Sequence, residues 1–258
     1  MDLKRKIRPI YWKLSAPLQK TIYSLYSSLM KLLVPIIIVK IRKGKFSKKV
    51  INQLTNIKDA VDFAFSFQYL AFTLRTAQIK YEINKLLETL QDLKPKIILE
   101  IGTAGGGTFF LFTRIAHPKA TLISVDLPGG AFGGGYAKWK IPIYKSFAIG
   151  NQKIKLLRAD SHNPKILEEV KNLINNKMVD FLFIDADHTY EGVKKDFMMY
   201  SSLVRKGGIV ALHDIVEHTK SSGCEVKKFW DEIKHDFEHL ELIKDIEQTA
   251  AGIGIIYL

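Results

Sequence analysis

Short apolar runs that end in an acidic residue recur along the chain beyond residue 96, and segments with a helical pattern separate them. We predict five strands from these runs, at residues 97–101, 121–126, 154–161, 179–185 and 208–214. Helices are predicted at 108–115, 164–175, 190–204 and 225–237, and a last apolar strand at 252–258. Strands that alternate with helices of this length form right-handed βαβ units, so the pattern predicts an α/β fold with a parallel sheet.

The first apolar run leads into a glycine-rich turn. Glu100 stands near the end of the run, and glycines follow at positions 102, 105, 106 and 107. Residues without a Cβ atom let the backbone approach a ligand, and the helix at 108–115 presents its N-terminus there. A dinucleotide fingerprint requires glycine at the third position of the turn, where Ala104 stands. The pattern indicates a nucleotide-type site, with a glycine-rich turn that binds nothing as the alternative.

Acidic residues at the ends of the next two strands suit other parts of a nucleoside. Asp126 ends the second strand about 24 residues after Gly102, where a carboxylate can accept hydrogen bonds from ribose hydroxyls. Asp160 ends the third strand, in a position to meet an adenine amino group. Any one such acid could instead cap a helix, but four strands that end in acids favour a ligand site.

Five segments carry a resemblance to a known family: LEIGTAGGGT (99–108), SVDLPGGAFGGGY (124–136), RADSHNP (158–164), LFIDADHTYEGVKKD (182–196) and LVRKGGIVALHDIV (203–216). From about residue 56 onward, the chain resembles class I methyltransferases related to macrocin O-methyltransferase and to proteins labelled cephalosporin hydroxylase. The resemblance implies a Rossmann-like, mostly parallel sheet of seven strands with the last antiparallel, and helices on both faces. It implies adenosylmethionine as cofactor, often with a divalent metal such as Mg²⁺. Cofactor contacts are expected from Glu100, Gly102, Thr103, Ala104, Gly105, Gly106, Asp126, Leu127, Asp160, Ser161 and Asp185.

Polar residues gather at the ends of the fourth and fifth strands. Asp185 and Asp187 end one strand, and His213 and Asp214 end the other, so we expect all four side chains in one cleft. The resemblance implies that Asp185, His213 and Asp214 are metal ligands, although the last pair is usually two acids, or an acid and an amide. Carboxylates suit Mg²⁺, Ca²⁺ or Mn²⁺, and an imidazole favours a transition metal. The alternative is that Asp185 contacts the cofactor and Asp214 caps the following segment.

Methyl transfer to a hydroxyl requires a group that removes the hydroxyl proton. His188, three residues after Asp185, is our first candidate for this base because imidazole titrates near neutral pH. His213 and Asp185 are the other catalytic candidates. A structural, hydrogen-bonding role for His188 stays open.

Residues 128–136 form a second glycine-rich stretch, and its ordering would cost much chain entropy. We predict a lid over cofactor and acceptor, with Phe132, Tyr136 and Trp139 as stacking surfaces. A surface loop is the alternative.

Charge is concentrated in the first 50 residues, which hold 13 Lys and Arg against one acid, Asp2, in a chain of net charge +13. The rest is close to neutral, which argues against a nucleic-acid substrate. We therefore predict a basic arm at 1–50, a helical lead-in at 51–95 with helices at 54–67 and 68–93, and a catalytic domain at 96–258. The single cysteine, Cys224, excludes an internal disulfide and thiolate zinc sites, and it fits a reducing, cytoplasmic setting.

The arm contains an apolar segment at 22–41, and three interpretations of it stay open. Lys31 and Pro35 interrupt it, so it is too short to span a bilayer. It could pack on the domain or on a second copy in a homo-oligomer. It could also lie on an anionic membrane surface at the inner face, which its basic flanks favour. Binding to nucleic acid is the third and least favoured.

The resemblance leads us to expect an O-methyltransferase that acts on a hydroxyl of a sugar or glycoconjugate. The sugar rests on the resemblance alone. Alternatives are methylation of a small phenol or natural product, an RNA methyltransferase, a non-catalytic adenosylmethionine-binding module, and an iron-dependent hydroxylase with His188, His213 and Asp185 as ligands.

Overall fold

A seven-stranded sheet forms the centre of the computed structural model, which describes residues 15–43, 50, 53–54, 56–69, 72–129, 132 and 134–258. Its strand order is β5–β4–β3–β6–β7–β9–β8. The strands are β3 (Ile97–Ile101), β4 (Thr121–Val125), β5 (Lys153–Leu157), β6 (Val179–Ile184), β7 (Val204–His213), β8 (Glu238–Leu242) and β9 (Ile253–Tyr257). The first five pair in parallel, and β9 lies antiparallel between β7 and β8. The predicted seven-stranded sheet, with its last strand antiparallel, is confirmed.

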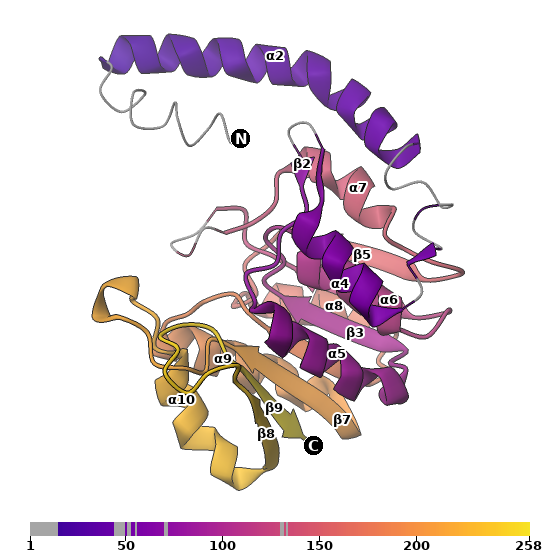
Figure 1. The fold of residues 1–258 in the computed structure, drawn as a ribbon, viewed down its shortest axis with the longest axis vertical. Helices are drawn as coiled ribbons and strands as arrows, with labels where there is room; N and C mark the ends of the chain where they lie inside the picture. The colour runs from indigo at the N-terminus through magenta and orange to yellow at the C-terminus, as the bar shows by residue number, and fades with distance from the viewer. Residues whose placement is uncertain are drawn as a thin grey trace.

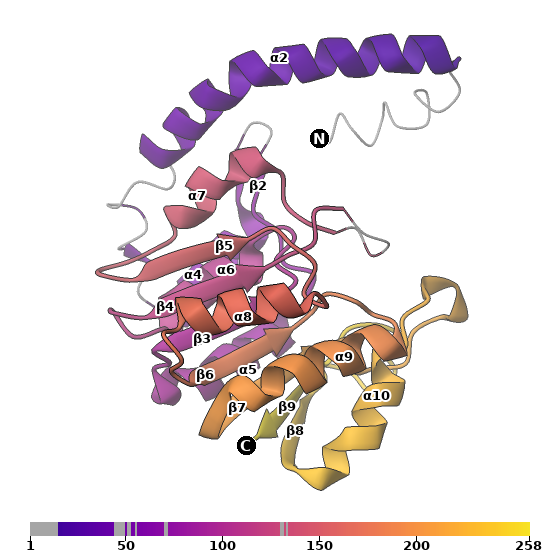
Figure 2. The same cartoon turned by 180° about the vertical axis from the view of Figure 1, so that it is seen from behind.

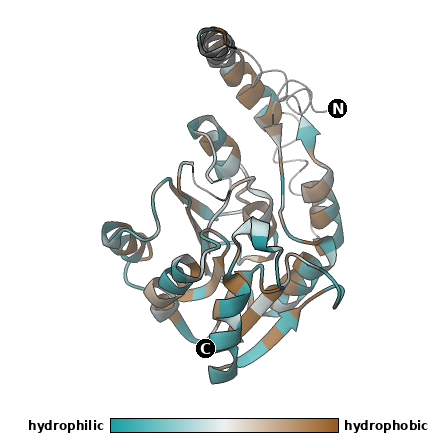
Figure 3. Ribbon diagram, turned by 90° about the vertical axis from the view of Figure 1, so that its left-hand side faces the viewer, coloured by the Kyte–Doolittle hydropathy of each residue, from teal (hydrophilic) through white to brown (hydrophobic). Residues whose placement is uncertain are grey.

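Helices cover both faces of this sheet, as predicted. One face carries α4 (Ile57–Ser66), α5 (Lys80–Leu93) and α6 (Gly107–Ile115) (Figure 1). The other carries α8 (Pro164–Leu173), α9 (Tyr190–Tyr200) and α10 (Val226–Ile233) (Figure 2). Two hydrophobic clusters fill the layers between helices and sheet. The covering helices carry both apolar and polar residues (Figure 3), as expected where one side faces a core and the other faces water.

The predicted helix at 68–93 is wrong in its first half. Residues there form a small antiparallel pair, β1 (Gln68–Tyr69) and β2 (Phe72–Thr73), and α5 begins only at Lys80. Phe72 is fully buried and packs edge-on against the rings of Trp139 and Tyr144. The extended chain that follows lets the carbonyl of Arg75 accept a 2.8 Å hydrogen bond from the Gly107 N–H. These tertiary contacts outweigh the local helical pattern.

Other differences concern the ends of elements. The helix predicted at 190–204 gives way to a short 3₁₀ turn, η2 (Ser201–Leu203), and that at 225–237 to η4 (Lys234–Asp236). Strand β8 follows η4 and was not predicted from any local pattern. Its first four residues are exposed, so it lacks the alternation of a half-buried strand.

Within the arm, residues Ala16–Lys43 form the long helix α2, and residues 1–14 and 44–49 lie outside the described part of the chain. Its C-terminal part contacts η1 (Lys138–Lys140) and α7 (Ile141–Lys145), and Ile37 and Ile41 are buried there. None of the described helices is long and apolar enough to cross a membrane. The division of the chain at residues 50 and 95 stays a prediction.

Candidate functional site

The glycine-rich turn after β3 packs closely against the loop after β6. Gly102 has a φ of +88°, and a Cβ atom there would lie 2.0 Å from the carbonyl oxygen of Asp185. The Asp185 N–H in turn donates a 2.8 Å hydrogen bond to Ile101. Position 102 therefore requires glycine, because its backbone is left-handed and no space is left for a Cβ atom. Ala104 also has a positive φ, of 40°, and its N–H donates to Asp126 Oδ2 at 2.8 Å.

Two buried residues support this turn from within the protein. Glu100 Oε2 accepts a 2.5 Å hydrogen bond from the Thr103 hydroxyl, which also lies 2.7 Å from Ser124 Oγ. Burial raises the pKa of Glu100 to about 8. Glu100 lines neither of the two cavities at the turn, and its predicted contact with the cofactor stays a prediction. Position 106 also requires glycine, because a Cβ there would lie 2.6 Å from the Tyr144 ring.

Two cavities share the turn at Gly102 and Ala104. The first, of about 330 Å³, is lined by most of the predicted cofactor residues, namely Gly102, Ala104, Asp126, Leu127, Asp160, Ser161 and Asp185. The second, of about 350 Å³, also reaches Thr103, Gly105, Thr76 and Gln78. The buried Thr76 Oγ1 and Gln78 Oε1 atoms have no hydrogen-bond partner among the described residues. Both volumes lie in the range of small-molecule sites, about 300–1,000 Å³, and the polar atoms fit the polar groups of adenosylmethionine.

A larger cavity, of about 560 Å³, lies at the amino ends of the strands beside Lys96, His117 and Lys153. We place the functional site at the carboxyl ends instead. Ligands of open α/β sheets bind there, and the chemically reactive side chains converge only there among the described residues.

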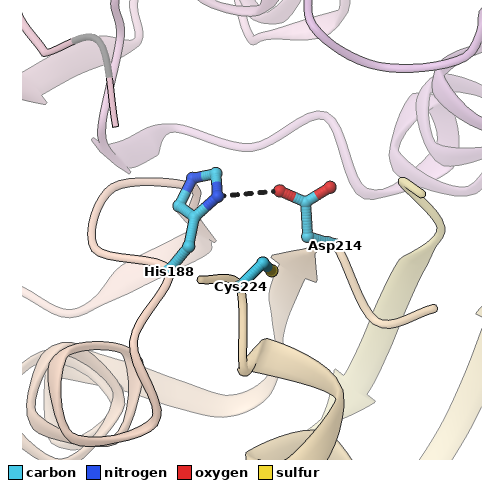
Figure 4. A group of neighbouring side chains, drawn as sticks. All are labelled: His188, Asp214 and Cys224. Atoms are coloured by element: carbon cyan, nitrogen blue, oxygen red, sulfur yellow. Dashed lines mark ion pairs between the residues drawn. The ribbon is translucent and has the colours of Figure 1, made fainter. Parts of the chain in front are cut away.

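Asp185, after β6, and Asp214, after β7, lie among three imidazoles. His213 Nδ1 is 3.1 Å from Asp185 Oδ1 and 3.3 Å from Asp214 Oδ1. His188 Nδ1 is 3.0 Å from Asp214 Oδ2, and a dashed line marks this ion pair in Figure 4. Its Nε2 is 3.5 Å from Asp185 Oδ1. His218 Nε2 is 3.2 Å from Asp214 Oδ1. The predicted catalytic residues His188, Asp185 and His213 therefore lie together.

Mutual charge decides the protonation of this cluster. Burial alone would raise the pKa of both carboxyl groups, but the neighbouring His213 and His188 outweigh it and hold each pKa below its usual value. Burial also opposes the charged imidazoles, yet the two carboxylates raise the pKa of His188 to about 12 and of His213 to about 10. As arranged, both imidazoles hold a proton at neutral pH, so His188 cannot accept one until the carboxylates are neutralised by other means.

The residues fit a divalent ion. Asp185, His213 and Asp214 each offer one ligand atom, and these atoms lie within 4.8 Å of one another. His213 is 4% exposed, and its Nε2 has no partner among the described residues, so only its Nδ1 side is engaged. Asp187 lines the first cavity together with Asp185, as expected, but its Oδ1 accepts from the Thr189 N–H and hydroxyl (3.0 and 2.8 Å), and it belongs to neither ligand group of the described residues.

The iron set of His188, His213 and Asp185 is not among the ligand groups that the described residues form. In the two groups that these residues do form, His188 lies with Asp214 and Cys224, and His213 lies with Asp185 and Asp214.

Gln78 was not predicted to act at this site. Its Nε2 donates a 2.7 Å hydrogen bond to Asp185 Oδ2, and its side chain is buried. The two residues are 107 positions apart, so no local pattern could reveal the contact. Gln78 orients the carboxylate that both the cofactor and metal predictions use.

The predicted lid is only partly described, because residues 130, 131 and 133 lie outside the described part of the chain. Phe132 stacks on the His188 ring with centroids 4.8 Å apart and planes 10° from parallel. Tyr136 is buried against Tyr144, and Trp139 packs on Phe72, so neither is a free stacking surface. Phe132 alone of the three aromatic residues lines the first cavity.

Comparison with known proteins gives a family match over residues 62–238, to the family described as rhamnosyl O-methyltransferase/CmcI. The uncharacterized protein R132 of Acanthamoeba polyphaga mimivirus is 28% identical over 144 residues, which cover 56% of this chain and 62% of that protein. The uncharacterized protein y4gI of Sinorhizobium fredii is 30% identical over 149 residues, which cover 55% of this chain and 15% of that protein. The chain thus matches less than two thirds of the length of either relative.

Among solved structures, an O-methyltransferase from Bacillus cereus in complex with SAH is similar, with a TM-score of 0.52 and 15% identity. The match covers 82% of this chain and 96% of that one. At this identity the likeness shows the fold alone.

Proposed function

The chain belongs to the rhamnosyl O-methyltransferase/CmcI family, and from this we propose that it transfers a methyl group from adenosylmethionine to a hydroxyl of a sugar or glycoconjugate. The observation that carries the proposal is the cavity at the strand ends, which Asp126, Asp160 and Asp185 line beside the Asp–His cluster. Asp126 would accept from ribose hydroxyls and Asp160 from the adenine amino group. Thr76 and Gln78 line the adjoining cavity and would meet the polar end of the methionine part.

In the reaction, the acceptor oxygen attacks the methyl carbon in line with sulfur, so an O–C bond forms as the S–C bond breaks. The sulfonium becomes a neutral thioether, and the hydroxyl proton must leave. A divalent ion held by Asp185, His213 and Asp214 would lower the pKa of the acceptor hydroxyl. With both carboxylates so neutralised, His188 would lose the interaction that raises its pKa and become able to accept the proton. Phe132, stacked on its ring, would shield this proton transfer from water.

The test is calorimetric titration of the full chain with adenosylhomocysteine, with and without Mg²⁺ or Mn²⁺. We expect micromolar binding that Asp160→Ala weakens by about tenfold or more, the loss of one charged hydrogen bond. To test position 126, Asp126→Asn is preferable to Asp126→Ala, because the amide oxygen of asparagine can still accept the hydrogen bond from the Ala104 N–H. Absence of binding by well-folded wild-type protein, with or without metal, would overturn the proposal.

The methyl acceptor that the protein uses distinguishes a sugar substrate from the alternative functions. Transfer of labelled methyl groups to rhamnose-containing glycoconjugates, but not to catechols or RNA, is the expected result. Transfer to phenols instead would favour a natural-product enzyme. Turnover that needs Fe²⁺ and an oxidisable co-substrate would favour a hydroxylase.

We also propose that helix α2 places this enzyme on an anionic membrane surface. Large apolar side chains are exposed along it at spacings of three, four and seven, at Leu18, Leu25, Leu29, Leu32, Leu33, Ile36 and Val39. The surrounding 50 residues carry 13 basic residues and one acid. An apolar stripe on a basic segment suits anionic headgroups, and the like charge opposes pairing with a second copy.

Vesicle sedimentation tests the membrane proposal. We expect binding to vesicles that contain phosphatidylglycerol, weak binding to pure phosphatidylcholine, and a decrease with salt. Glutamate at Leu25 and Leu32, which are 67% and 73% exposed, should weaken binding about tenfold or more. Glutamate at Ile246, which is 91% exposed on the catalytic part, is the matched control and should have no effect. Equal loss in both variants, or a stable dimer that dissociates in the Leu25/Leu32 variant, would contradict the proposal.

A further inference from the structure

Three side chains with different donor atoms converge beside the Asp–His cluster. They are His188 from the loop after β6, Asp214 from the end of β7, and Cys224 from the loop before α10 (Figure 4). One nitrogen, one oxygen and one sulfur atom of these residues lie within 4.8 Å of one another. The set shares Asp214 with the predicted divalent site, but His188 and Cys224 are not part of that site.

Backbone contacts hold Cys224 at this place. The N–H of the next residue, Glu225, donates a 2.7 Å hydrogen bond to the carbonyl oxygen of His188. The Cys224 N–H donates to Ser222 Oγ at 3.1 Å, and Gly223 adopts a φ of +70°. The loop that carries the thiol is therefore fixed to the loop that carries the imidazole.

The donor atoms define the class of ligand. A thiolate, an imidazole and a carboxylate together suit Zn²⁺ and similar borderline-soft ions, whereas Mg²⁺ and Ca²⁺ take oxygen ligands. Zinc–ligand distances of about 2.0–2.3 Å place tetrahedral ligand atoms roughly 3.3–3.8 Å apart, so the three atoms need only a small closure. Cys224 is partly exposed, which gives an ion an entry path.

We propose that His188, Asp214 and Cys224 form a binding site for a zinc-class divalent ion, which overlaps the divalent site of Asp185, His213 and Asp214 at Asp214. Binding releases the thiol proton of Cys224 and any proton on His188 to solvent, since both must coordinate in their deprotonated forms. The single cysteine excludes only zinc sites with several thiolates, so the exclusion of all thiolate zinc sites predicted from the sequence was too broad for this mixed set.

Occupancy of this site inhibits methyl transfer, because the ion takes His188, the predicted base, and competes for Asp214. This second statement rests on the proposed function. The binding itself does not.

Cobalt titration tests the binding, because Co²⁺ bound to thiolate gives a near-ultraviolet charge-transfer band. The chain has one cysteine, so the band can come only from Cys224. We expect a band that saturates at one Co²⁺ per chain, disappears on addition of Zn²⁺, and is absent in Cys224→Ser. Asp185→Asn should keep the band, since Asp185 belongs to the other ligand set. Zinc affinity should fall about tenfold or more in Cys224→Ser, with its thermal unfolding unchanged.

Absence of the band in wild-type protein, or a band that saturates at half a Co²⁺ per chain through a bridged dimer, would overturn the site. Inhibition is read separately, as the zinc dependence of methyl transfer. Micromolar zinc should inhibit the wild type and leave Cys224→Ser active at the same concentration. A wild type that shows the band but keeps full activity in zinc would overturn the inhibition alone. Because the absorbance needs no turnover, failure of the methyltransferase proposal leaves the binding test valid.

Discussion

Substitution of Gly102 by alanine tests how closely the turn after β3 must approach the loop after β6. The residue has a φ of +88°, and an added Cβ would lie 2.0 Å from the Asp185 carbonyl oxygen, where ordinary contact needs 3.4 Å or more. The left-handed conformation costs an alanine about 1–2 kcal/mol. Separation of the two loops also weakens the hydrogen bond from Asp185 to Ile101, at about 0.5–1.5 kcal/mol. We expect a loss of about 3 kcal/mol in the free energy of unfolding.

Gly129 supplies the matched control. Its φ is +82°, but nothing lies within 4 Å of an added Cβ. Gly129→Ala therefore carries the conformational cost alone, about 1 kcal/mol after the smaller entropy of the unfolded chain is counted. The difference between the two variants, about 2 kcal/mol, measures the close approach.

Urea unfolding gives both losses, and calorimetry with adenosylhomocysteine at a temperature where both variants are folded gives their effect on the site. Gly102→Ala should also lose binding, because the displaced loop carries Asp185 and with it the contact to Gln78. Equal destabilisation in the two variants, or intact binding by Gly102→Ala, would refute the inference that packing at this point shapes the site.

Three further substitutions test buried polar contacts, at the site and away from it. Gln78→Leu removes the hydrogen bond to Asp185 and should lower the rate of methyl transfer and the metal affinity by about 10–100-fold without unfolding the protein. An unchanged rate and affinity would show that the contact does not contribute to the site. Glu82 accepts a 3.0 Å hydrogen bond from the Gly252 N–H, and Glu82→Gln places an amide against that N–H. Urea unfolding should therefore show a loss of about 1–3 kcal/mol in the free energy of unfolding. Glu100 has a folded pKa of about 8, so the folded protein keeps a proton that the unfolded chain releases from about pH 4.5 upward. Stability should therefore fall between pH 4.5 and 8, by at most about 1.4 kcal/mol per pH unit, and Glu100→Gln should flatten that slope in urea unfolding at pH 5 and 8.

The sheet could be predicted because its signals are local. Strands β3 and β4 are almost entirely buried and read as apolar runs, and Glu100 and Asp126 mark strand ends that hydrophobicity alone would not define. Strand β8 could not be predicted from the sequence, because four of its five residues are exposed at the sheet edge. The β1–β2 pair escaped because its stability comes from Phe72 packing on rings some 70 residues away.

The candidate site was predictable in its residue types but not in its pairings. Asp185, His213 and Asp214 come together because parallel strands end at one edge, which is a property of the topology. Gln78 and Cys224 reach the same place from loops whose course depends on distant contacts, so their roles needed the structure. Asp187 lies in the same motif as Asp185 and yet bonds to Thr189, because only the path of the chain after β6 decides which carboxylate faces the cluster.

His213 sets the charge balance of this cluster. Two buried carboxylates alone would repel each other, and buried charges persist only when they are paired. Here His188 and His213 pair with Asp185 and Asp214 as protonated imidazoles, so two positive charges balance two negative ones. A divalent ion brings the same two positive charges and leaves both imidazoles free to be neutral. With an acid at position 213, three carboxylates would face the single charge of a protonated His188 when no cation is bound, so the cluster would not be balanced in that condition. The imidazole at position 213 therefore keeps the site electrically neutral both with and without a bound cation. It also leaves His188 as a group that is protonated without the cation and able to accept a proton with it.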